Sequence, residues 1–309
     1  MKNKYDFRDI IFQELYEIMS NDKDIILLTN DMGALGVDRI KDKFRNQFIN
    51  VGIAEQNIIG IASGLASTGY KVIVYGIISH LIFRSLEQIK LDICLPELPI
   101  TLIGIGSGLS YGNDGPTHHA VEDIGIMRIL PNINIFNPSD STSAKHSLIY
   151  SINYKKPSFI RLDKEKLTNI YKSINEIKSG FKIHGKNSEG LIISTGLMVR
   201  YALDIQNELK IKNINVSVMD IIHLNPINKS LTKIIKNYNW IIFIDEAFEH
   251  GSLIEILHAS LINQKYKFVK SFNLGSKYFF GSATRKYVFS KRSISVKKIV
   301  NFVIKNIKI

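Results

Sequence analysis

The sequence predicts an α/β protein with two doubly wound domains, the first over residues 1–165 and the second over residues 189–309. In each half, short runs of β-branched residues alternate with segments of helical periodicity. A polar, glycine-containing stretch at 166–188 separates the two series and is predicted to be the linker. With 309 residues, 45% of them hydrophobic, each domain has enough apolar side chains for its own core.

The first half should form a largely parallel sheet with helices on both faces, because strands and helices alternate along the chain. Strands are predicted near 25–29, 71–75, 100–105 and 133–136, and helices near 7–19, 54–68, 80–92 and 140–152. In the second half, strands are predicted near 191–195, 215–220, 240–245 and 267–272, and helices near 198–210, 228–237 and 251–263. A last helix at about 293–308 has apolar side chains at helical spacing and should dock on its own domain.

The composition excludes several classes of protein. The chain has no apolar run of roughly eighteen residues and no signal-peptide pattern at its start, so we expect a cytoplasmic protein without membrane contact. Cys94 is the only cysteine, which rules out an intrachain disulfide and a cysteine-based metal site. The net charge of +12 comes from lysines scattered among Ile and Asn without a nucleic-acid-binding motif. We therefore expect no nucleic-acid partner, whereas an anionic substrate is compatible with the charge.

A single carboxylate, Glu55, follows an apolar strand end and opens a predicted helix. The helix dipole favours an acid in the first turn, so a purely structural role is one interpretation of Glu55. The other is a functional acid. The same helix is rich in small residues that would let another surface pack closely against it: Gly60, Ala62, Ser63, Gly64 and Ala66.

The loop at 112–123 is the second segment that points to chemistry. It has Gly112 and Gly115 on both sides of Asn113 and Asp114, then Pro116 and two adjacent histidines, His118 and His119, after a predicted strand and before a helix. Turn capping would explain Asp114 and Thr117. Loops at the strand ends of α/β sheets are nevertheless where ligands bind, so we favour a functional role. Adjacent histidines point in different directions and no third ligand follows at a familiar spacing, so we predict no metal site.

Four segments together resemble the transketolase superfamily over essentially the whole chain. They are VGIAEQNIIGIASGL at 51–65, FRSLEQIKLDI at 83–93, YGNDGPTHHAVED at 111–123 and NPSD at 137–140. The chain is similar to the subunit of split transketolases that carries the pyrimidine-binding domain, here 1–165, and the C-terminal domain, here 189–309. It is also similar to the same region of 1-deoxyxylulose-5-phosphate synthase.

The resemblance implies roles for individual residues. Glu55 corresponds to the glutamate that hydrogen-bonds N1′ of the aminopyrimidine of thiamine diphosphate. His118 corresponds to a residue beside the substrate carbonyl that assists proton transfer, a task suited to an imidazole. Asp114 matches the acid that recognises a sugar hydroxyl. Arg161 matches an arginine that grips a distal phosphate, and a surface ion pair is its equally plausible structural role.

Other cofactor contacts are implied more loosely. Asp31 and Met32 lie in a strand-end loop whose family counterparts touch the cofactor. The aromatic wall against the pyrimidine falls in the segment before Arg84, where Phe83 is the candidate and Leu81 the alternative. The chain departs from full-length transketolases at Gly106, where those enzymes have a histidine that contacts phosphate.

The family's Gly-Asp-Gly motif, which holds Mg²⁺ and the diphosphate, is absent from the sequence. The resemblance therefore implies a partner, the diphosphate-binding N-terminal subunit, in an α₂β₂ heterotetramer acting on sugars or sugar phosphates. The favoured activity is transfer of a two-carbon unit between a ketose and an aldose. The alternatives are a decarboxylating condensation like that of 1-deoxyxylulose-5-phosphate synthase and, less favoured, a 2-oxo-acid dehydrogenase β subunit or a non-catalytic scaffold.

Overall fold

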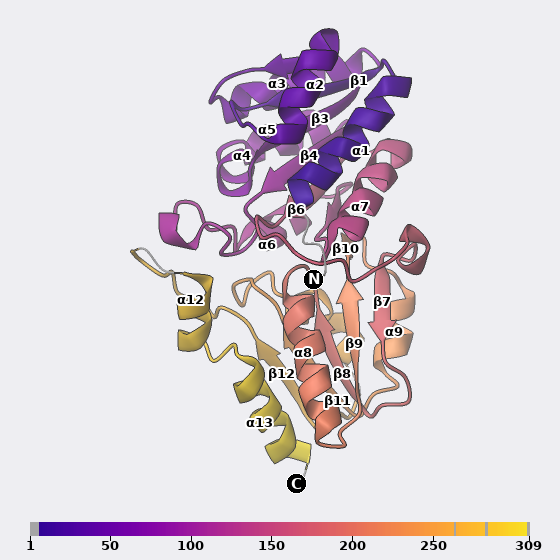
Figure 1. The fold of residues 1–309 in the computed structure, drawn as a ribbon, viewed down its shortest axis with the longest axis vertical. Coiled ribbons are helices and arrows are strands. Elements are labelled where there is room, and N and C mark those ends of the chain that lie inside the picture. The colour runs from indigo at the N-terminus through magenta and orange to yellow at the C-terminus, as the bar shows by residue number, and fades with distance from the viewer. Residues whose placement is uncertain (1–5, 263, 282–283, 308–309) are drawn as a thin grey trace.

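The computed structural model describes residues 6–262, 264–281 and 284–307, which form two α/β domains stacked end to end (Figure 1). The predicted fold class is confirmed, because each domain is built on one mixed, mostly parallel sheet. The outermost residues of the predicted domain boundaries, 1 and 309, and the ends of two predicted helices, 263 and 308, lie outside the described residues. No helix in the described part of the chain is long and apolar enough to cross a bilayer.

The first sheet has seven strands in the order β10-β5-β6-β4-β3-β1-β2. All neighbours are parallel except β10, which comes from the second half of the chain and pairs antiparallel with β5. The strands are β1 (Ile25–Thr29), β2 (Phe48–Asn50), β3 (Lys71–Ile77), β4 (Ile100–Ile105), β5 (Asn134–Phe136), β6 (Ser158–Leu162) and β10 (His223–Asn225). The central strands are continuous apolar runs because helices cover both faces of the sheet.

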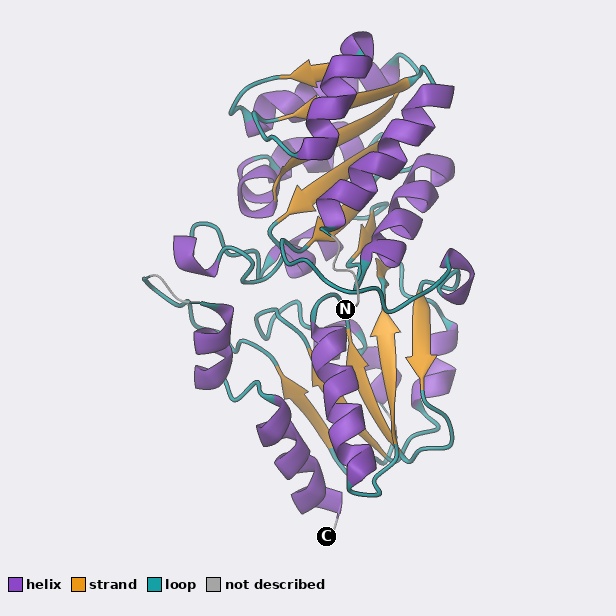
Figure 2. Ribbon diagram, viewed as in Figure 1, coloured by secondary structure: helices purple, strands orange, loops and turns teal. Residues whose placement is uncertain are grey.

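Two layers of helices enclose this sheet (Figure 2). One layer contains α1 (Phe7–Asn21), α2 (Leu35–Lys43) and α7 (Ser141–Tyr154). The other contains α3 (Glu55–Ser67), α4 (Ile78–Arg84) and α6 (Asp123–Arg128). The helix predicted at 80–92 is divided into α4, the short α5 (Leu86–Gln88) and a π-helical turn at Ile89–Cys94, which buries Cys94 as expected. Short 3₁₀ turns lie at Arg45–Gln47, Gly112–Asp114 and Ile174–Glu176.

The second sheet has five strands in the order β12-β11-β8-β9-β7, with only β7 antiparallel. They are β7 (Phe181–His184), β8 (Gly190–Ser194), β9 (Val216–Ile221), β11 (Trp240–Ile244) and β12 (Val269–Phe272). One face is covered by α8 (Met198–Ile211), α12 (Arg285–Lys291) and α13 (Val296–Ile307), and the other by α9 (Ser230–Ile235), α10 (Leu253–Ile256) and α11 (His258–Leu261). The C-terminal helix α13 docks on its own domain as predicted, with Ile299, Val300 and Val303 buried.

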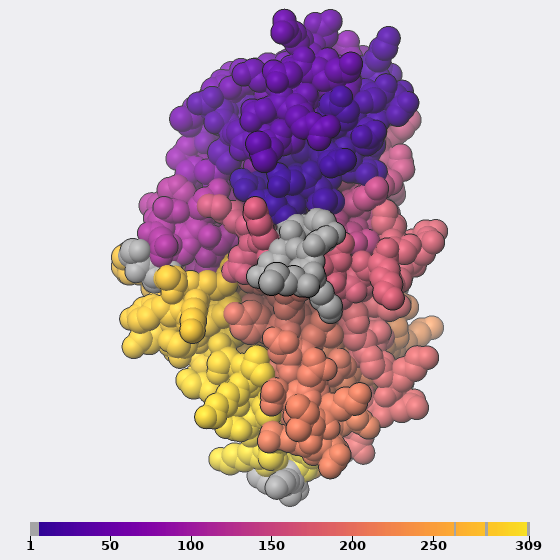
Figure 3. Space-filling model, in the orientation of Figure 1, coloured from indigo at the N-terminus to yellow at the C-terminus, as the bar shows by residue number. Residues whose placement is uncertain are grey.

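The two domains share structure across their boundary. The segment predicted as the linker, 166–188, contains β7, which belongs to the second sheet, and β10 crosses back to the first sheet. All four residues of β7 are only partly buried, because it is an edge strand, so its hydrophobic signal in the sequence is weak. Figure 3 shows the two domains packed together over a broad face.

Candidate functional site

Several of the predicted site residues lie at one edge of the first sheet. Asp31 and Met32 follow β1, Glu55 follows β2, and the loop at 106–122, here called the histidine loop, follows β4. The carboxyl ends of parallel strands meet at the same edge of a sheet, and ligands of open α/β sheets bind there. Segments far apart in the sequence thus form one site.

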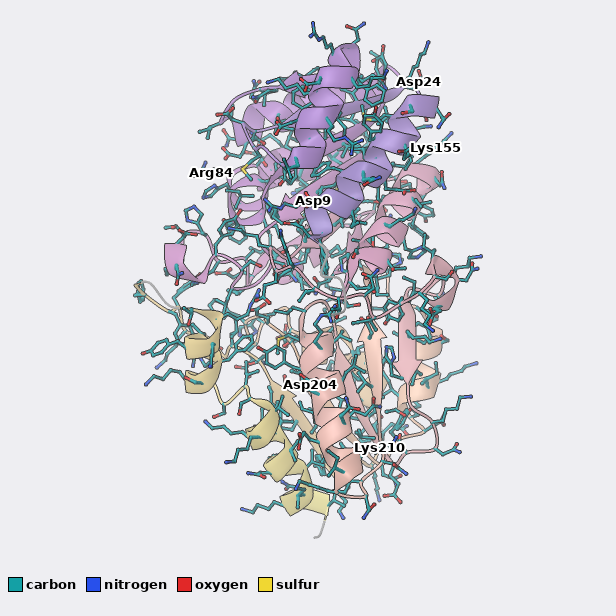
Figure 4. The ribbon with its side chains drawn as sticks, viewed as in Figure 1. Asp9, Asp24, Arg84, Lys155, Asp204 and Lys210 are labelled. Atoms are coloured by element: carbon teal, nitrogen blue, oxygen red, sulfur yellow. The ribbon has the colours of Figure 1, made fainter. Side chains whose placement is uncertain are left out.

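Glu55 faces a cavity of about 240 Å³ at this edge. Its side chain is buried, with 8% of the residue exposed, and it accepts a hydrogen bond of 2.9 Å from Nη1 of Arg84. Arg84 is half exposed and lies on the outer side of the first domain (Figure 4). The cavity is lined by Asn30, Asp31, Met32, Ile53, Glu55, Ile77, His80 and Arg84.

The loop after β1 is tied to the segment that leads into Glu55. Asp31 adopts a left-handed conformation, with φ of 55°, and its N–H donates to Oδ1 of Asn50 (3.0 Å). The amide of Asn50 donates in turn to the Asp31 carboxylate (3.0 Å), and the amide of Asn30 donates to the carbonyl of Gly52 (3.2 Å). The Oδ1 atom of Asn30 is buried and has no hydrogen-bond partner among the described residues. Asn30 and Glu55 line the same cavity.

The histidine loop is closed at its base and braced from within. Gly108 and Ala120 form an antiparallel bridge, and Nε2 of His119 donates to the carbonyl of Gly112 (3.3 Å). Burial lowers the pKa of His119, so the buried imidazole is held neutral as a donor. His119 is thus a structural brace, while His118 faces outward from the same loop.

His118 reaches the Glu55 cavity through His80. The two imidazole rings are 4.8 Å apart in an edge-to-face arrangement, and His80 itself lines the cavity. Burial lowers the pKa of His80, with nearby Arg84 and His118 acting in the same direction. Nδ1 of His118 lies 3.0 Å from Oγ1 of Thr117, which orients the imidazole. The two segments singled out in the sequence therefore meet in space.

The residues predicted to form the wall of the cavity are not those that line it. Leu81 is completely buried in the core, and Phe83, 38% exposed, is not among the residues that line the cavity. His80 and Arg84, four positions apart and therefore on one face of the helix that begins at Ile78, line the cavity instead. His80 is the wall residue that the sequence analysis missed, since a lone histidine in an apolar helix gave no signal of its own.

Arg161 lies in the interior of the first domain. It is 4% exposed, and its Nε and Nη2 atoms donate to the two carboxylate oxygens of Asp123 at 2.6 and 3.0 Å. Nη2 also donates to the carbonyl of Ala120 (3.0 Å). The Nε and Nη2 atoms of the guanidinium are therefore engaged in a buried ion pair at the base of the histidine loop. The ion pair considered as its structural role is therefore buried rather than on the surface, and the phosphate contact stays a prediction.

A different cation lies next to the loop. The ring of Tyr111 occupies the space that a side chain at Gly106 would take, since a Cβ there would come within 2.3 Å of that ring. Nζ of Lys164 lies 3.8 Å from the centre of the same ring, and the Tyr111 and His118 rings are 5.8 Å apart. Asp114 is exposed on the same loop. Tyr111, with Lys164 over its ring, thus fills the space next to Gly106.

Comparisons with known proteins identify the family of both domains. The sequence profile of the transketolase pyrimidine-binding domain matches residues 3–169, and that of the transketolase C-terminal domain matches residues 180–273. A subunit of the apulose-4-phosphate transketolase of Actinobacillus succinogenes is 31% identical over 256 residues, which cover 82% of each chain. 1-Deoxy-D-xylulose-5-phosphate synthase of Dictyoglomus turgidum is 32% identical over 270 residues, which cover 84% of this chain and 43% of that one.

A solved structure has the same architecture. A split-gene transketolase, described as an inactive β4 tetramer, superimposes with a TM-score of 0.85 over 98% of this chain and 99% of its own, at 22% identity. This likeness concerns the fold, while the matched profiles and relatives establish the relationship. The chain belongs to the transketolase family and comprises its pyrimidine-binding and C-terminal domains.

Proposed function

We propose that the chain is one subunit of a thiamine-diphosphate-dependent transketolase that moves a two-carbon unit between ketose and aldose sugars. The observation that carries this proposal is the buried Glu55 carboxylate, which faces a cavity that also reaches His118 through His80. The similarity to a subunit of the apulose-4-phosphate transketolase, over most of the length of both chains, supports the same assignment.

The cavity fits the aminopyrimidine of thiamine diphosphate in its chemistry. An aminopyrimidine has ring nitrogens, an amino group that donates hydrogen bonds, and two apolar faces. The cavity offers the Glu55 carboxylate, the unpartnered Oδ1 of Asn30 and apolar walls from Met32 and Ile77. Among the described residues, no group of three or more His, Cys, Asp or Glu side chains could hold a metal ion. We therefore assign Mg²⁺ and the diphosphate to a partner subunit.

When bound, thiamine diphosphate supplies the carbanion chemistry of two-carbon transfer. Glu55 would share a proton with N1′ of the pyrimidine from a site shielded from water. His80 would orient the ring by contact with its face. His118 would give and take a proton at the substrate oxygen, because an imidazole can do both near neutral pH.

Substrate recognition would come from the histidine loop and its neighbour. Asp114, exposed on that loop, would accept a hydrogen bond from a sugar hydroxyl. Lys164, held over Tyr111, would attract an anionic group of the sugar in place of the predicted Arg161. The open side of the cavity carries Ile53, which is 75% exposed, so we infer that a diphosphate-binding subunit covers it in an α₂β₂ assembly.

A second candidate is a decarboxylating condensation, because a 1-deoxyxylulose-5-phosphate synthase is 32% identical to this chain. The chain spans less than half of that synthase, so the proposal again requires a partner. Pyruvate consumption with release of CO₂ distinguishes this reaction from ketol transfer.

The test is co-purification with the product of a gene that encodes the Gly-Asp-Gly motif, followed by assays of the complex with a ketose panel and with pyruvate. We expect two-carbon transfer that depends on both thiamine diphosphate and the partner, in a cytoplasmic enzyme of carbohydrate metabolism. The proposed function is wrong if the complex fails to bind thiamine diphosphate, and CO₂ release from pyruvate would establish the second candidate instead.

A further inference from the structure

A buried arginine of the second domain reaches the base of the histidine loop. Arg285, the first residue of α12, is 9% exposed. Its Nη2 atom donates to Oγ of Ser110 (3.1 Å) and lies 3.5 Å from the carbonyl oxygen of Ser107. Ser107 lies four residues before Tyr111, and Ser110 lies directly before it. Arg285 therefore contacts the histidine loop near its beginning.

The same guanidinium binds three carboxylates. Nη2 donates to Asp163 (2.6 Å), Nη1 to Glu165 (2.5 Å) and Nε to Glu246 (2.7 Å). Asp163 and Glu165 flank Lys164 in the sequence. The residues on either side of Lys164 are therefore both partners of one arginine, which fixes the lysine over the ring of Tyr111.

The second domain also holds the far end of the loop. The N–H of Phe248 donates to the carbonyl of Val121 (3.0 Å), and the Tyr278 hydroxyl donates to the Glu122 carboxylate. At the near end, Glu246 packs so tightly against Gly108 that a Cβ there would come within 2.3 Å of its carboxylate. Both ends of the histidine loop are thus fixed by the C-terminal domain.

We propose that Arg285 is a positioning residue: it sets the place of the histidine loop and of Lys164, and so aligns Asp114, His118 and Lys164 toward the sugar. This inference rests on the proposed function. It gives the C-terminal domain a part in substrate recognition, although no residue of that domain lines the Glu55 cavity. Substrate binding should therefore depend on Arg285, whereas cofactor binding should not.

Two mild substitutions test this in the full chain. Ser110→Ala removes the hydrogen bond from Arg285 to Ser110, together with the bond from Oγ of Ser110 to the carbonyl of Ser107 (2.7 Å), and leaves the ion cluster intact. Arg285→Lys keeps the charge but loses the planar fork that binds several partners. Arg285→Met would leave Asp163 and Glu246 buried without a cation and is expected to destabilise the whole chain, so it is not used. The matched control is Arg200→Lys, an arginine of α8 that also bonds across the domains, to Thr168, but does not touch the loop.

The first readout is hydrogen exchange of peptides covering 107–122, and the second is the KM for the sugar in the complex with its partner. We expect both variants to speed exchange in the loop and to raise the KM about tenfold, because small displacements of positioning groups have large effects on binding and turnover. The thiamine diphosphate affinity measured by calorimetry should stay within about twofold of wild type. The control should change none of these.

The inference is overturned if Ser110→Ala and Arg285→Lys leave exchange at 107–122 unchanged. It is also overturned if cofactor affinity falls in parallel with sugar affinity, since that would indicate a general structural role. Loop exchange does not require activity. If the wild-type complex shows no thiamine-diphosphate-dependent turnover while the variants still loosen the loop, the proposed function fails and the positioning of the loop by Arg285 stands.

Discussion

Glu55 combines two properties that a proton-sharing acid needs. It is shielded from water at the first turn of α3, and its one side-chain partner, Arg84, is half exposed. An exposed arginine exchanges a carboxylate for water at little cost, because surface ion pairs are worth roughly 0–1 kcal/mol. The carboxylate is therefore buried without being committed to a permanent partner.

Glu55→Gln should lower turnover of the assembled enzyme by about 10²–10⁴-fold, because the amide keeps the shape of the side chain but cannot hold the proton. Steady-state ketol transfer measured with the partner subunit checks this. The thermal midpoint should match that of the wild type, which excludes unfolding as the cause. Turnover within a few-fold of the wild-type value would show that Glu55 is only a helix-start residue.

His80→Ala should weaken thiamine diphosphate binding to the assembled complex by about tenfold, because the ring loses its contact with the imidazole. His80→Phe restores an aromatic face of similar size and should retain most of the affinity. Calorimetric titration of the complex measures both. Phe83→Ala is the matched control, since Phe83 lies on the same helix but outside the cavity. A weakening by Phe83→Ala alone would reinstate the sequence-based assignment.

Arg161→Lys should lower stability, whereas Lys164→Ala should change substrate binding. Loss of the bidentate bond between Arg161 and Asp123 should lower the free energy of unfolding by about 3 kcal/mol, because a buried charge is left poorly paired. Lys164→Ala should leave stability nearly unchanged and raise the KM for phosphorylated sugars more than that for neutral ones. Thermal denaturation and substrate kinetics of the two variants distinguish these effects. A selective loss of phosphate recognition in Arg161→Lys would contradict the structural role.

At the scale of elements, α3 has an outer face that its own chain does not use. A Cβ added at Gly60 or Gly64 would meet nothing within 4 Å, and both glycines are exposed. Glycine in the interior of a helix costs about 1 kcal/mol relative to alanine. Nothing in the fold of this chain requires glycine at these two positions. Close packing of another subunit against α3 would require it.

Gly60→Ala and Gly64→Ala should therefore stabilise the isolated chain by about 0.5–1 kcal/mol each and weaken its assembly with the partner. Thermal denaturation of the chain alone and titration with the partner measure the two effects separately. Lys210→Ala on α8, in the second domain (Figure 4), is the control for a helix-surface change away from α3. Unchanged assembly in both glycine variants would place the interface elsewhere.

Element prediction from the sequence succeeded for most of the fully buried strands, but β6 was not predicted although all five of its residues are buried, because Arg161 interrupts its apolar run. Strands β1 and β4 fall at the predicted residues, because a parallel strand covered on both faces is an unbroken apolar run. The short or marginal elements β2, β7 and β10 were not predicted. They have three or four residues each and are largely exposed or half-buried, so neither periodicity nor hydrophobicity marks them.

At the scale of the whole molecule, a buried polar network joins the two domains. Oδ2 of Asp220, on β9, accepts hydrogen bonds from Ser139 of the first domain (2.5 Å) and from the Tyr171 hydroxyl (2.6 Å). His184 stacks on Tyr171, and Asp140 binds the backbone N–H of Tyr171 (2.8 Å). Burial raises the pKa of Asp220 to about 7, and the nearby charge of Asp140 acts in the same direction. The hydrogen bonds from Ser139 and Tyr171 and the charge of Arg200 lower this pKa and offset part of the shift.

This pKa makes the domain contact sensitive to pH. The folded chain holds a proton on Asp220 that the unfolded chain releases near pH ~4. The contribution of Asp220 to the free energy of unfolding is complete below pH ~4. Above that pH it decreases by up to about 1.4 kcal/mol per pH unit, and it is lost as the pH rises through about 7. Asp220→Asn cannot ionise, so its stability relative to wild type should rise from pH 5 to pH 8. Thermal midpoints at both values check this, and a constant difference would show that Asp220 stays ionised.

The sequence by itself determined the fold class, the strands that form the two sheet centres, and the local segments around Glu55 and His118. These features are encoded by periodicity and by residues adjacent in the chain. Only the tertiary structure decided which partners meet. It placed His80 beside His118, buried Arg161 against Asp123, put Lys164 over Tyr111, and brought Arg285 to a loop 175 residues earlier. Such contacts depend on how helices pack across a sheet edge and between domains, and a one-dimensional pattern does not contain that packing.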